Sequence, residues 1–236
     1  MKKLTKMFEV FAAIALLAVS CVALAACGPK EYVFEIEDGV LTNGQQQGFD
    51  WTTWQPTDEW TDVEISVEAR HEYTGTEAIG KDVTSVGNFY GKGAKITFTI
   101  TSSKECDATF TLRAASAQVK MEGGFQFVGM NEVDLSEGQF VKLSVNGTDV
   151  DLEGTLPGLE EFPDGIEENS YWYNFGTGTA TIHLVKGENV IVLYAGEGAT
   201  SSGVNLDNFS IKCVAKLTWE PTDNSDRLST LESEEE

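Results

Sequence analysis

The strongest constraint on the fold is a strict two-residue alternation near the end of the chain. Between residues 201 and 214, the side chains of Asp207, Phe209, Ile211 and Cys213 alternate with polar ones. A period of two is typical of a β-strand that buries one face. Similar patterns predict further strands at 63–70, 94–100, 109–114, 141–145, 179–184 and 190–194. The sequence therefore predicts an all-β chain.

Short turns separate some of these patterns, and longer segments separate others. The dipeptide Asn146-Gly147 lies between two strand patterns and favours a tight hairpin. Residues 186–189 lie between two later patterns, and we expect a second hairpin there. The segments 38–61 and 73–87 are expected to be loops.

Three carboxylates indicate a possible cation site. Asp207 shares the parity of its apolar neighbours, and Lys212 has the opposite parity. Glu35 and Glu37 share one face of a predicted strand, about 7 Å apart along it. Like charges so close repel each other, and a divalent cation with oxygen ligands, such as calcium, removes that conflict. The alternative, that both glutamates face water, remains open.

The N-terminal segment has the pattern of an export signal. Lys2, Lys3 and Lys6 precede an apolar run over 11–26 that is too short for a membrane-spanning helix. Leu24-Ala25-Ala26-Cys27 is typical of a lipobox, which predicts a signal peptide at 1–26 and lipidation of Cys27. The chain is then expected on the outer face of the bacterial cytoplasmic membrane. The alternatives are lipidation of Cys21, or a plain secretory signal with an incidental cysteine.

Length and charge bound the remaining chain. After a short linker at 27–30, residues 31–216 fit one domain, and the polar, acidic segment 217–236 is expected to be disordered. Removing three lysines and one glutamate with residues 1–26 changes the formal charge from −22 to −24. This charge argues against nucleic acid as a partner, and leaves the lipid anchor as the means of membrane attachment. We expect a monomer.

Two further cysteines follow the exported N-terminus. Cys106 has the parity of the apolar residues Ala108 and Phe110, and Cys213 has that of Phe209. Both thiols are therefore expected to point inward. They could be two buried free thiols or, in an exported chain, a disulfide. The spacing in the sequence does not decide between them.

Several segments, in this order, resemble carbohydrate-binding modules of families 6 and 35, and family 35 more closely. They are E-x-E at 35–37, VGNFYGKGAKITFTI at 86–100, FTLRAAS at 110–116, VKGENVIVLY at 185–194 and GVNLDNFSI at 203–211. The resemblance implies a jelly-roll β-sandwich of two antiparallel sheets. It also implies a structural calcium between the first and last strands. Its side-chain ligands would be Glu35, Glu37 and Asp207, with backbone carbonyls near 82–84.

The resemblance also implies a sugar site at the loop end of the sandwich. Trp172, with Tyr171 or Tyr173, would supply an aromatic face, and Asn205 would supply an amide. Tyr90 would add a second wall. Trp172 as a core residue is the alternative. A separate aromatic cluster lies in a segment without a counterpart in the family, and could either cap the sandwich or stack on sugars: Trp51, Trp54 and Trp60.

These patterns favour a non-catalytic carbohydrate-binding protein anchored at the cell surface. A second hypothesis is a small glycoside hydrolase, because Glu132, Asp134 and Glu137 resemble the E-x-D-x-x-E signature of family 16. The residues after Glu137 depart from that signature, so we expect no catalysis. A third hypothesis is an adhesion or scaffold module with a protein partner. His71 and His183 have no cysteine or histidine at zinc-binding spacing.

Overall fold

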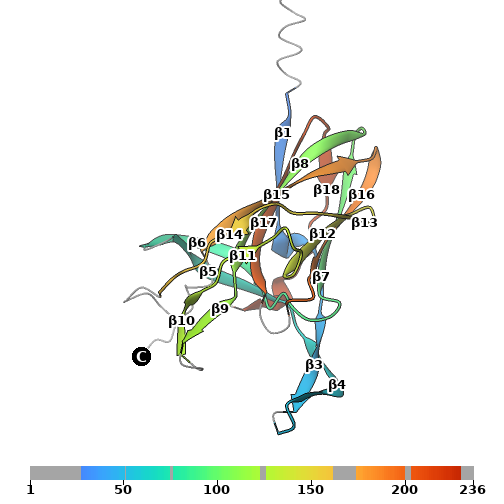
Figure 1. Cartoon of the computed structure of the whole chain (residues 1–236). Coiled ribbons are helices and arrows are strands. Elements are labelled where there is room, and N and C mark those ends of the chain that lie inside the picture. Colours follow the sequence, from blue (N-terminus) through green and yellow to red (C-terminus); the bar gives the residue numbers. More distant parts are fainter. Residues whose placement is uncertain are drawn as a thin grey trace, which may run out of the picture.

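The computed structural model describes residues 28–50, 52–74, 77–122, 126–161, 174–199 and 203–229. Two main sheets face each other and form a β-sandwich of the jelly-roll type, which confirms the predicted fold class (Figure 1). Among the described residues, no helix is long and apolar enough to cross a membrane. Residues 1–27, with the predicted signal and Cys27, lie outside the described part.

Each sheet is built from strands that are far apart in the sequence. The first sheet has the order β15-β8-β17-β6-β5-β19, with β1 beside β17: β1 Lys30–Glu35, β5 Ser66–Thr74, β6 Glu77–Gly87, β8 Cys106–Ser116, β15 Phe175–Leu184, β17 Val204–Cys213 and β19 Leu228–Ser229. The second has the order β13-β12-β16-β7-β18, with β2 beside β7: β2 Val40–Thr42, β7 Lys95–Ser102, β12 Val141–Val145, β13 Thr148–Val150, β16 Gly187–Ala195 and β18 Leu217–Trp219.

Smaller elements lie outside the two main sheets. They are the hairpin β3 Gly44–Asp50 and β4 Gln55–Val63, the hairpin β9 Val119–Glu122 and β10 Gln126–Met130, the pair β11 Val133–Asp134 and β14 Thr155–Leu156, and the 3-10 turns η1 Ile36–Asp38 and η3 Ser225–Arg227.

The space between the sheets is filled by aromatic rings. Phe209 of β17 stacks on Phe34 of β1 at 4.8 Å and on Phe110 of β8 at 5.0 Å, between ring centroids. The ring of Phe98, from the opposite sheet, meets Phe209 edge-on at 4.8 Å. These side chains are at most 2% exposed. Burial of such rings is the main favourable term in a sandwich of this size.

A β-bulge interrupts β17 at Asp207. The pairing of β17 with β8 shifts between Leu206, which pairs with Ala114, and Asn208, which pairs with Arg113. Asp207 is thus an extra residue in the strand, and a bulge redirects the side chain it carries. The alternation in the sequence placed Asp207 on the apolar face with Phe209, and the bulge removes it from that series.

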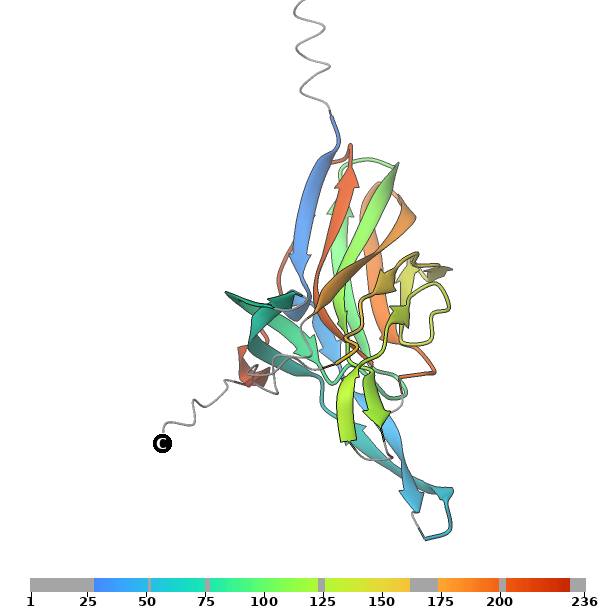
Figure 2. The ribbon, with the colours of Figure 1, turned by 60° about the vertical axis from the view of Figure 1, so that its left-hand side comes forward.

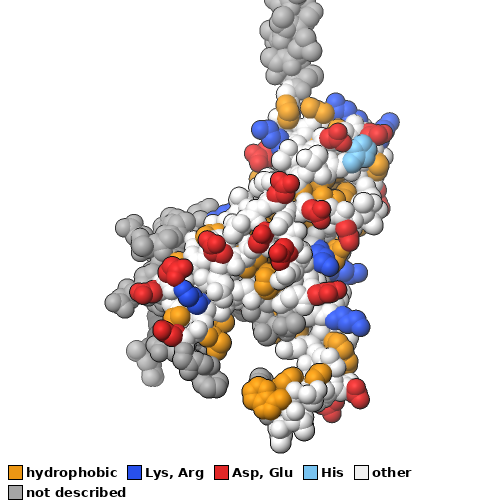
Figure 3. Space-filling model, in the orientation of Figure 1, with side chains coloured by type: hydrophobic (Ala, Val, Ile, Leu, Met, Phe, Trp, Pro, Cys, Tyr) orange, Lys and Arg blue, Asp and Glu red, His pale blue; other side chains and the backbone are white. Residues whose placement is uncertain are grey.

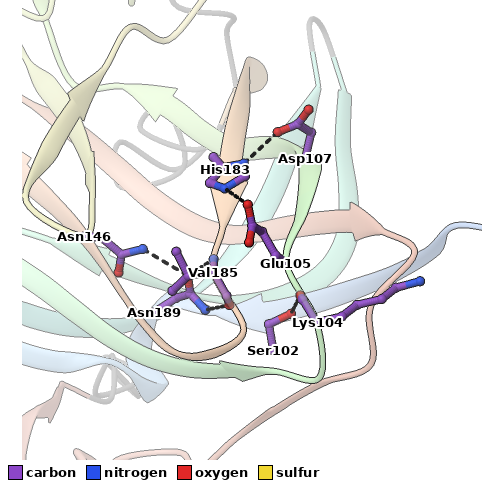
Figure 4. Close-up of polar contacts among 8 residues, drawn as sticks. All are labelled: Ser102, Lys104, Glu105, Asp107, Asn146, His183, Val185 and Asn189. Atoms are coloured by element: carbon purple, nitrogen blue, oxygen red, sulfur yellow. Dashed lines mark hydrogen bonds and ion pairs between the residues drawn. The ribbon is translucent and has the colours of Figure 1, made fainter.

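The predicted hairpin at 186–189 is wrong, because its two strands belong to different sheets. β15 pairs with β8, whereas β16 pairs with β12 and β7. Each strand has one apolar face, and these faces meet across the core. The fully buried Asn189 holds the connection: it accepts from Val185 N at 2.8 Å and donates to Val185 O at 2.9 Å (Figure 4). The predicted Asn146-Gly147 hairpin is confirmed, with φ values of 53° and 80°.

Two expected loops are strands. Residues 77–87 form β6, and most of 38–61 forms β2, β3 and β4. The β3–β4 hairpin projects from the sandwich (Figure 2). It buries few side chains, so its sequence lacks the alternation of a core strand.

The expected disorder from residue 217 is also wrong for residues 217–229. β18 pairs with β7, and β19 pairs in parallel with β5, so the segment crosses from one sheet to the other. Between them, Asn224 Nδ2 donates to the backbone oxygens of Glu37 at 2.6 Å and Gly39 at 2.8 Å. The folded domain therefore extends beyond the expected boundary at 216. Residues 230–236 lie outside the described part.

Candidate functional site

A hollow of about 790 Å³ lies between the β3–β4 hairpin and the body of the sandwich. Figure 3 shows apolar side chains gathered on the hairpin, at the lower end of the molecule. Four aromatic side chains line the hollow, from the hairpin and from β16: Phe49, Trp54, Trp60 and Tyr194. Polar side chains lie among them: Gln45, Gln46, Gln47, Lys92, Lys142 and Glu197.

Strand pairing brings the hairpin residues to one face. Gln47 lies opposite Trp60, and Phe49 lies opposite Pro56. Directly opposed residues in an antiparallel pair share a face. The Gln47 side chain therefore lies on the same face of the hairpin as the Trp60 ring, and both border the hollow.

The base of the hairpin is fixed to a turn of the body. Gln45 and Lys92 exchange two backbone hydrogen bonds of 2.9 and 2.8 Å. Gly91 has φ of 88°, and a Cβ there would lie 2.9 Å from the backbone oxygen of Gln45. Lys92 also places its Nζ 5.3 Å from the centroid of the Trp60 ring, a cation–π contact that holds the ring.

The tip of the hairpin presents two more rings. Trp54 is 69% exposed and Phe49 is 41% exposed, and their rings meet edge-on at 6.3 Å. Trp54 has φ of 55°, in the left-handed region that non-glycine residues seldom adopt. The backbone of Trp54 is thus in a costly conformation, and its ring leaves apolar area open to contact with a ligand.

The opposite wall comes from β16 and β12. Tyr194 Oη donates to Asp149 Oδ1 at 2.6 Å, which fixes the phenol ring. Partial burial, with the hydrogen bond and the negative charge of Asp149, raises the pKa of Tyr194 to about 12. The phenol therefore stays neutral. Lys142 lies opposite Tyr194 in the strand pairing.

The hollow thus combines flat apolar faces with convergent hydrogen-bonding groups. Amides both donate and accept, and ammonium groups donate. Such a lining suits a ligand that has apolar C–H faces and a rim of hydroxyl groups.

The predicted loop-end site is only partly within the described residues. Tyr171, Trp172 and Tyr173 lie outside them, as does Trp51. Tyr90 is half-buried and directly precedes the Gly91–Gly93 turn that borders the hollow. Asn205 is 8% exposed and pairs with Ala115 of β8.

The predicted acidic cluster is brought together, and it includes a cation that the sequence analysis missed. Asp207 is 4% exposed. The guanidinium of Arg113 donates a hydrogen bond to its carboxylate, and Asn208 Nδ2 donates a second one at 2.8 Å. The Arg113 guanidinium also stacks on Phe175, at 4.1 Å from the ring centroid. The sequence analysis found no local positive partner for Asp207, and the structure provides a distant one in Arg113. Arg113 lies opposite Asn208 on the neighbouring strand, and the bulge turns Asp207 toward it.

Glu37 is the strained member of this cluster. Burial raises the pKa of Glu37 to about 7. A backbone hydrogen bond lowers this pKa, and the negative charges of Glu35, Asp38 and Asp207 raise it further. Its Oε2 atom is buried and has no hydrogen-bond partner among the described residues. An orphaned carboxylate oxygen among acids is what a calcium ion would satisfy. The described residues nevertheless contain no group of three or more His, Cys, Asp or Glu arranged to hold a metal.

Glu132, Asp134 and Glu137 are not gathered around the hollow that Glu137 lines in the described residues. That hollow has a volume of about 220 Å³, and its lining includes neither Glu132 nor Asp134. Asp134 Oδ1 accepts from the backbone and hydroxyl of Ser136 at 2.9 and 2.7 Å, which lowers its pKa and closes a local turn. Asp134 therefore stabilises a surface turn.

His183 of β15 contacts two carboxylates at the surface, near the start of β8. Its Nδ1 lies 2.9 Å from Asp107 Oδ1 and its Nε2 lies 3.3 Å from Glu105 Oε1 (Figure 4). The hydrogen bond to Asp107 raises the pKa of His183. Each ring nitrogen faces a different carboxylate, so the three side chains do not converge on one point as metal ligands would. The His71 side chain is outside the described part.

Comparison with protein-family models found no match, and neither did comparison with curated proteins. Among solved structures, family 35 carbohydrate-binding modules recur. One from Clostridium thermocellum is 14% identical, with a TM-score of 0.42 over 77% of this chain and 97% of the module. One from Cellvibrio japonicus is 17% identical, with a TM-score of 0.36 over 77% of this chain and all of the module. An exo-β-1,3-galactanase from Phanerochaete chrysosporium is 17% identical, with a TM-score of 0.37, and the match spans 29% of that enzyme. At these identities the likeness concerns the fold and assigns no residue.

Proposed function

We propose that this protein binds carbohydrate without hydrolysing it, through the hollow beside the β3–β4 hairpin. The observation that carries the proposal is the set of exposed rings around that hollow, with glutamine and lysine side chains between them. Trp60 supplies an inner face and the Phe49–Trp54 pair supplies an outer one. The faces of a pyranose ring are apolar and pack on aromatic rings, while its hydroxyl groups exchange hydrogen bonds with amides.

A lipid on Cys27 would leave the hollow accessible. β1 begins at Lys30, at the upper end of the molecule in Figures 1 and 2, and the β3–β4 hairpin projects from the lower end. A tether of two residues between Cys27 and Lys30 would hold that upper end at the membrane. The hollow would then point away from the cell surface, toward external polysaccharide.

A glycan array probed with the full exported chain, purified in detergent, tests the function. We expect binding to a defined set of saccharides and no release of reducing ends from glucans or xylans. Hydrolysis that disappears in Glu132→Gln would instead support the glycosidase hypothesis. An array without a bound saccharide, together with a captured protein partner, would support the adhesion hypothesis.

Lipidation is tested by replacing Cys27 with alanine. The variant is expected to leave the detergent phase and appear in the medium, or to accumulate unprocessed, because it lacks the acceptor thiol for the lipid. Cys21→Ala is the matched control and should remain in the detergent phase. Unchanged partitioning of Cys27→Ala would contradict the anchor.

We also propose a stabilising calcium ion held by Glu35 and Glu37, with Asp207 beside them. The support is the buried Oε2 atom of Glu37, which has no hydrogen-bond partner among the described residues. Because Arg113 already neutralises Asp207, the ion would rest mainly on the two glutamates and backbone oxygens. The ion would relieve their repulsion and supply no chemistry to a reaction.

Calcium is therefore expected to raise the melting temperature of the chain, and EDTA to lower it, since an ion that binds only the folded state stabilises it by mass action. The calcium effect should be larger at pH 8 than at pH 5, because a protonated carboxyl group does not bind the ion. Glu37→Gln should abolish most of it, and the surface control Glu132→Gln should not. Melting curves that respond to neither calcium nor EDTA would contradict the site.

A further inference from the structure

Two thiols terminate neighbouring strands at the same end of one sheet. Cys106 is the first residue of β8 and Cys213 is the last residue of β17. These strands are adjacent and antiparallel, paired as far as Lys212 with Thr109. Cys213 is 2% exposed within the core, and the half-buried Cys106 packs against the same core. Both side chains therefore lie on the inner face of the sheet.

The strand ends place the two thiols near each other. Cys106 is close enough to Cys213 to affect its pKa through a hydrogen bond as well as through charge. The Cys213 thiol also donates to the backbone oxygen of Ala215 at 3.5 Å, which fixes its sulfur at the end of β17. Burial raises the pKa of Cys213, which leaves Cys106 as the thiol that a reagent in solution reaches more easily.

We propose that Cys106 and Cys213 form a disulfide bond once the chain meets a disulfide oxidant outside the cytoplasm. The thiolate of Cys106 attacks the disulfide of the oxidant, forms a mixed disulfide and releases one thiol. The thiolate of Cys213 then attacks the Cys106 sulfur and releases the second thiol. Two protons leave the protein, and its two electrons reduce the oxidant from one disulfide to two thiols. Exposure to such an oxidant rests on the proposed export, whereas closure depends only on the two side chains.

This bond would lie next to the proposed membrane tether. Cys213 pairs with Lys30, the first residue of β1 and the third residue after Cys27. A force applied at Cys27 would be transmitted through β1 to the neighbouring strand β17. The disulfide would join β17 covalently to β8 at that end, and it would close a long loop, the arrangement in which a cross-link removes the most freedom from the unfolded chain.

The test starts from the reduced, folded full chain, to which oxidised glutathione is added. We expect the thiols of Cys106 and Cys213 to disappear together, and a peptide pair linked through them to appear in the mass spectrum without retained glutathione. The melting temperature should rise by about 10 °C relative to the reduced chain. The chain isolated directly from exporting cells should already carry the linked pair.

Single variants separate closure from simple thiol oxidation. Cys213→Ala should trap a stable glutathione adduct on Cys106, because the second thiol is missing. Cys106→Ala should react much more slowly, because its remaining thiol is buried. A wild-type chain that keeps both thiols free, or that retains glutathione on Cys106, would overturn the proposal. Neither result depends on saccharide binding, so this test and that of the proposed function fail independently.

Discussion

Replacing Trp60 with alanine is expected to weaken saccharide binding by about 30-fold, or about 2 kcal/mol. Trp60 is the inner ring of the hollow, and Lys92 holds it in place, so its face is available without prior ordering. Removing it leaves the neighbouring amides without the surface that positions the sugar. Isothermal titration with the best saccharide from the array measures the loss.

Two further variants sharpen that result. Trp54→Ala should weaken binding less than Trp60→Ala, because Trp54 is 69% exposed at the tip. Met121→Ala, which removes a 51% exposed apolar side chain outside the hollow, should leave affinity unchanged. A Trp60→Ala chain that is folded and binds within twofold of the wild type would exclude Trp60 from the site.

Replacing Arg113 with alanine is expected to lower the free energy of unfolding by about 3 kcal/mol and the melting temperature by about 10 °C. Asp207 would remain buried, at 4% exposure, beside Glu37 and without its guanidinium partner. The variant would also lose the contact of Arg113 with the Phe175 ring. Urea unfolding in the presence of EDTA measures the effect without an added cation to replace the arginine.

The surface pair of Lys120 and Glu160 provides the matched control. The Lys120 Nζ and Glu160 Oε2 atoms lie 2.6 Å apart, but Glu160 is 95% exposed, so Lys120→Ala should lower the free energy of unfolding far less than Arg113→Ala. In the double variant Arg113→Met with Asp207→Leu, much of the lost stability should return, because the buried carboxylate is removed together with its partner. An Arg113→Ala chain as stable as Lys120→Ala would show that Asp207 does not need its partner.

The sequence predicts strands wherever one face is buried in the core. Phe209, Ile211 and Cys213 of β17 alternate because water lies on one side of the sheet and the core on the other. The Asn146-Gly147 turn is predictable because left-handed φ angles select those two residue types. In these places local chemistry decides the structure.

Pairing between distant segments is what the sequence does not reveal. Periodicity is the same whether β15 and β16 pair with each other or face each other across the core. The β3–β4 hairpin projects into solvent, so no buried face marks its strands. A bulge adds one residue without changing the residue types, and for this reason Asp207 could not be separated from its apolar neighbours.

The residues of the candidate site likewise divide into those that local sequence indicates and those that depend on contacts between distant segments. The sequence draws attention to Trp54 and Trp60 because tryptophan is unusual in a polar segment. It does not single out Tyr194 or Lys92, because they reach the hollow through β16 and the Gly91–Gly93 turn. Arg113 was likewise missed, since its role depends on the neighbouring strand.

The most direct test of the proposed site is a saccharide titration followed through the indole N–H resonances of the five tryptophans in a ¹H–¹⁵N correlation spectrum, each assigned by a Trp→Phe variant. Trp219 is an internal control, because its partly buried ring packs against Phe34, with 5.2 Å between the ring centroids. The proposal predicts that the signals of Trp60 and Trp54 move as the saccharide saturates the protein, while those of Trp219 and Trp172 stay. Movement of Trp172 with Trp60 and Trp54 unchanged would contradict it and place the sugar at the loop-end site that the family resemblance implies.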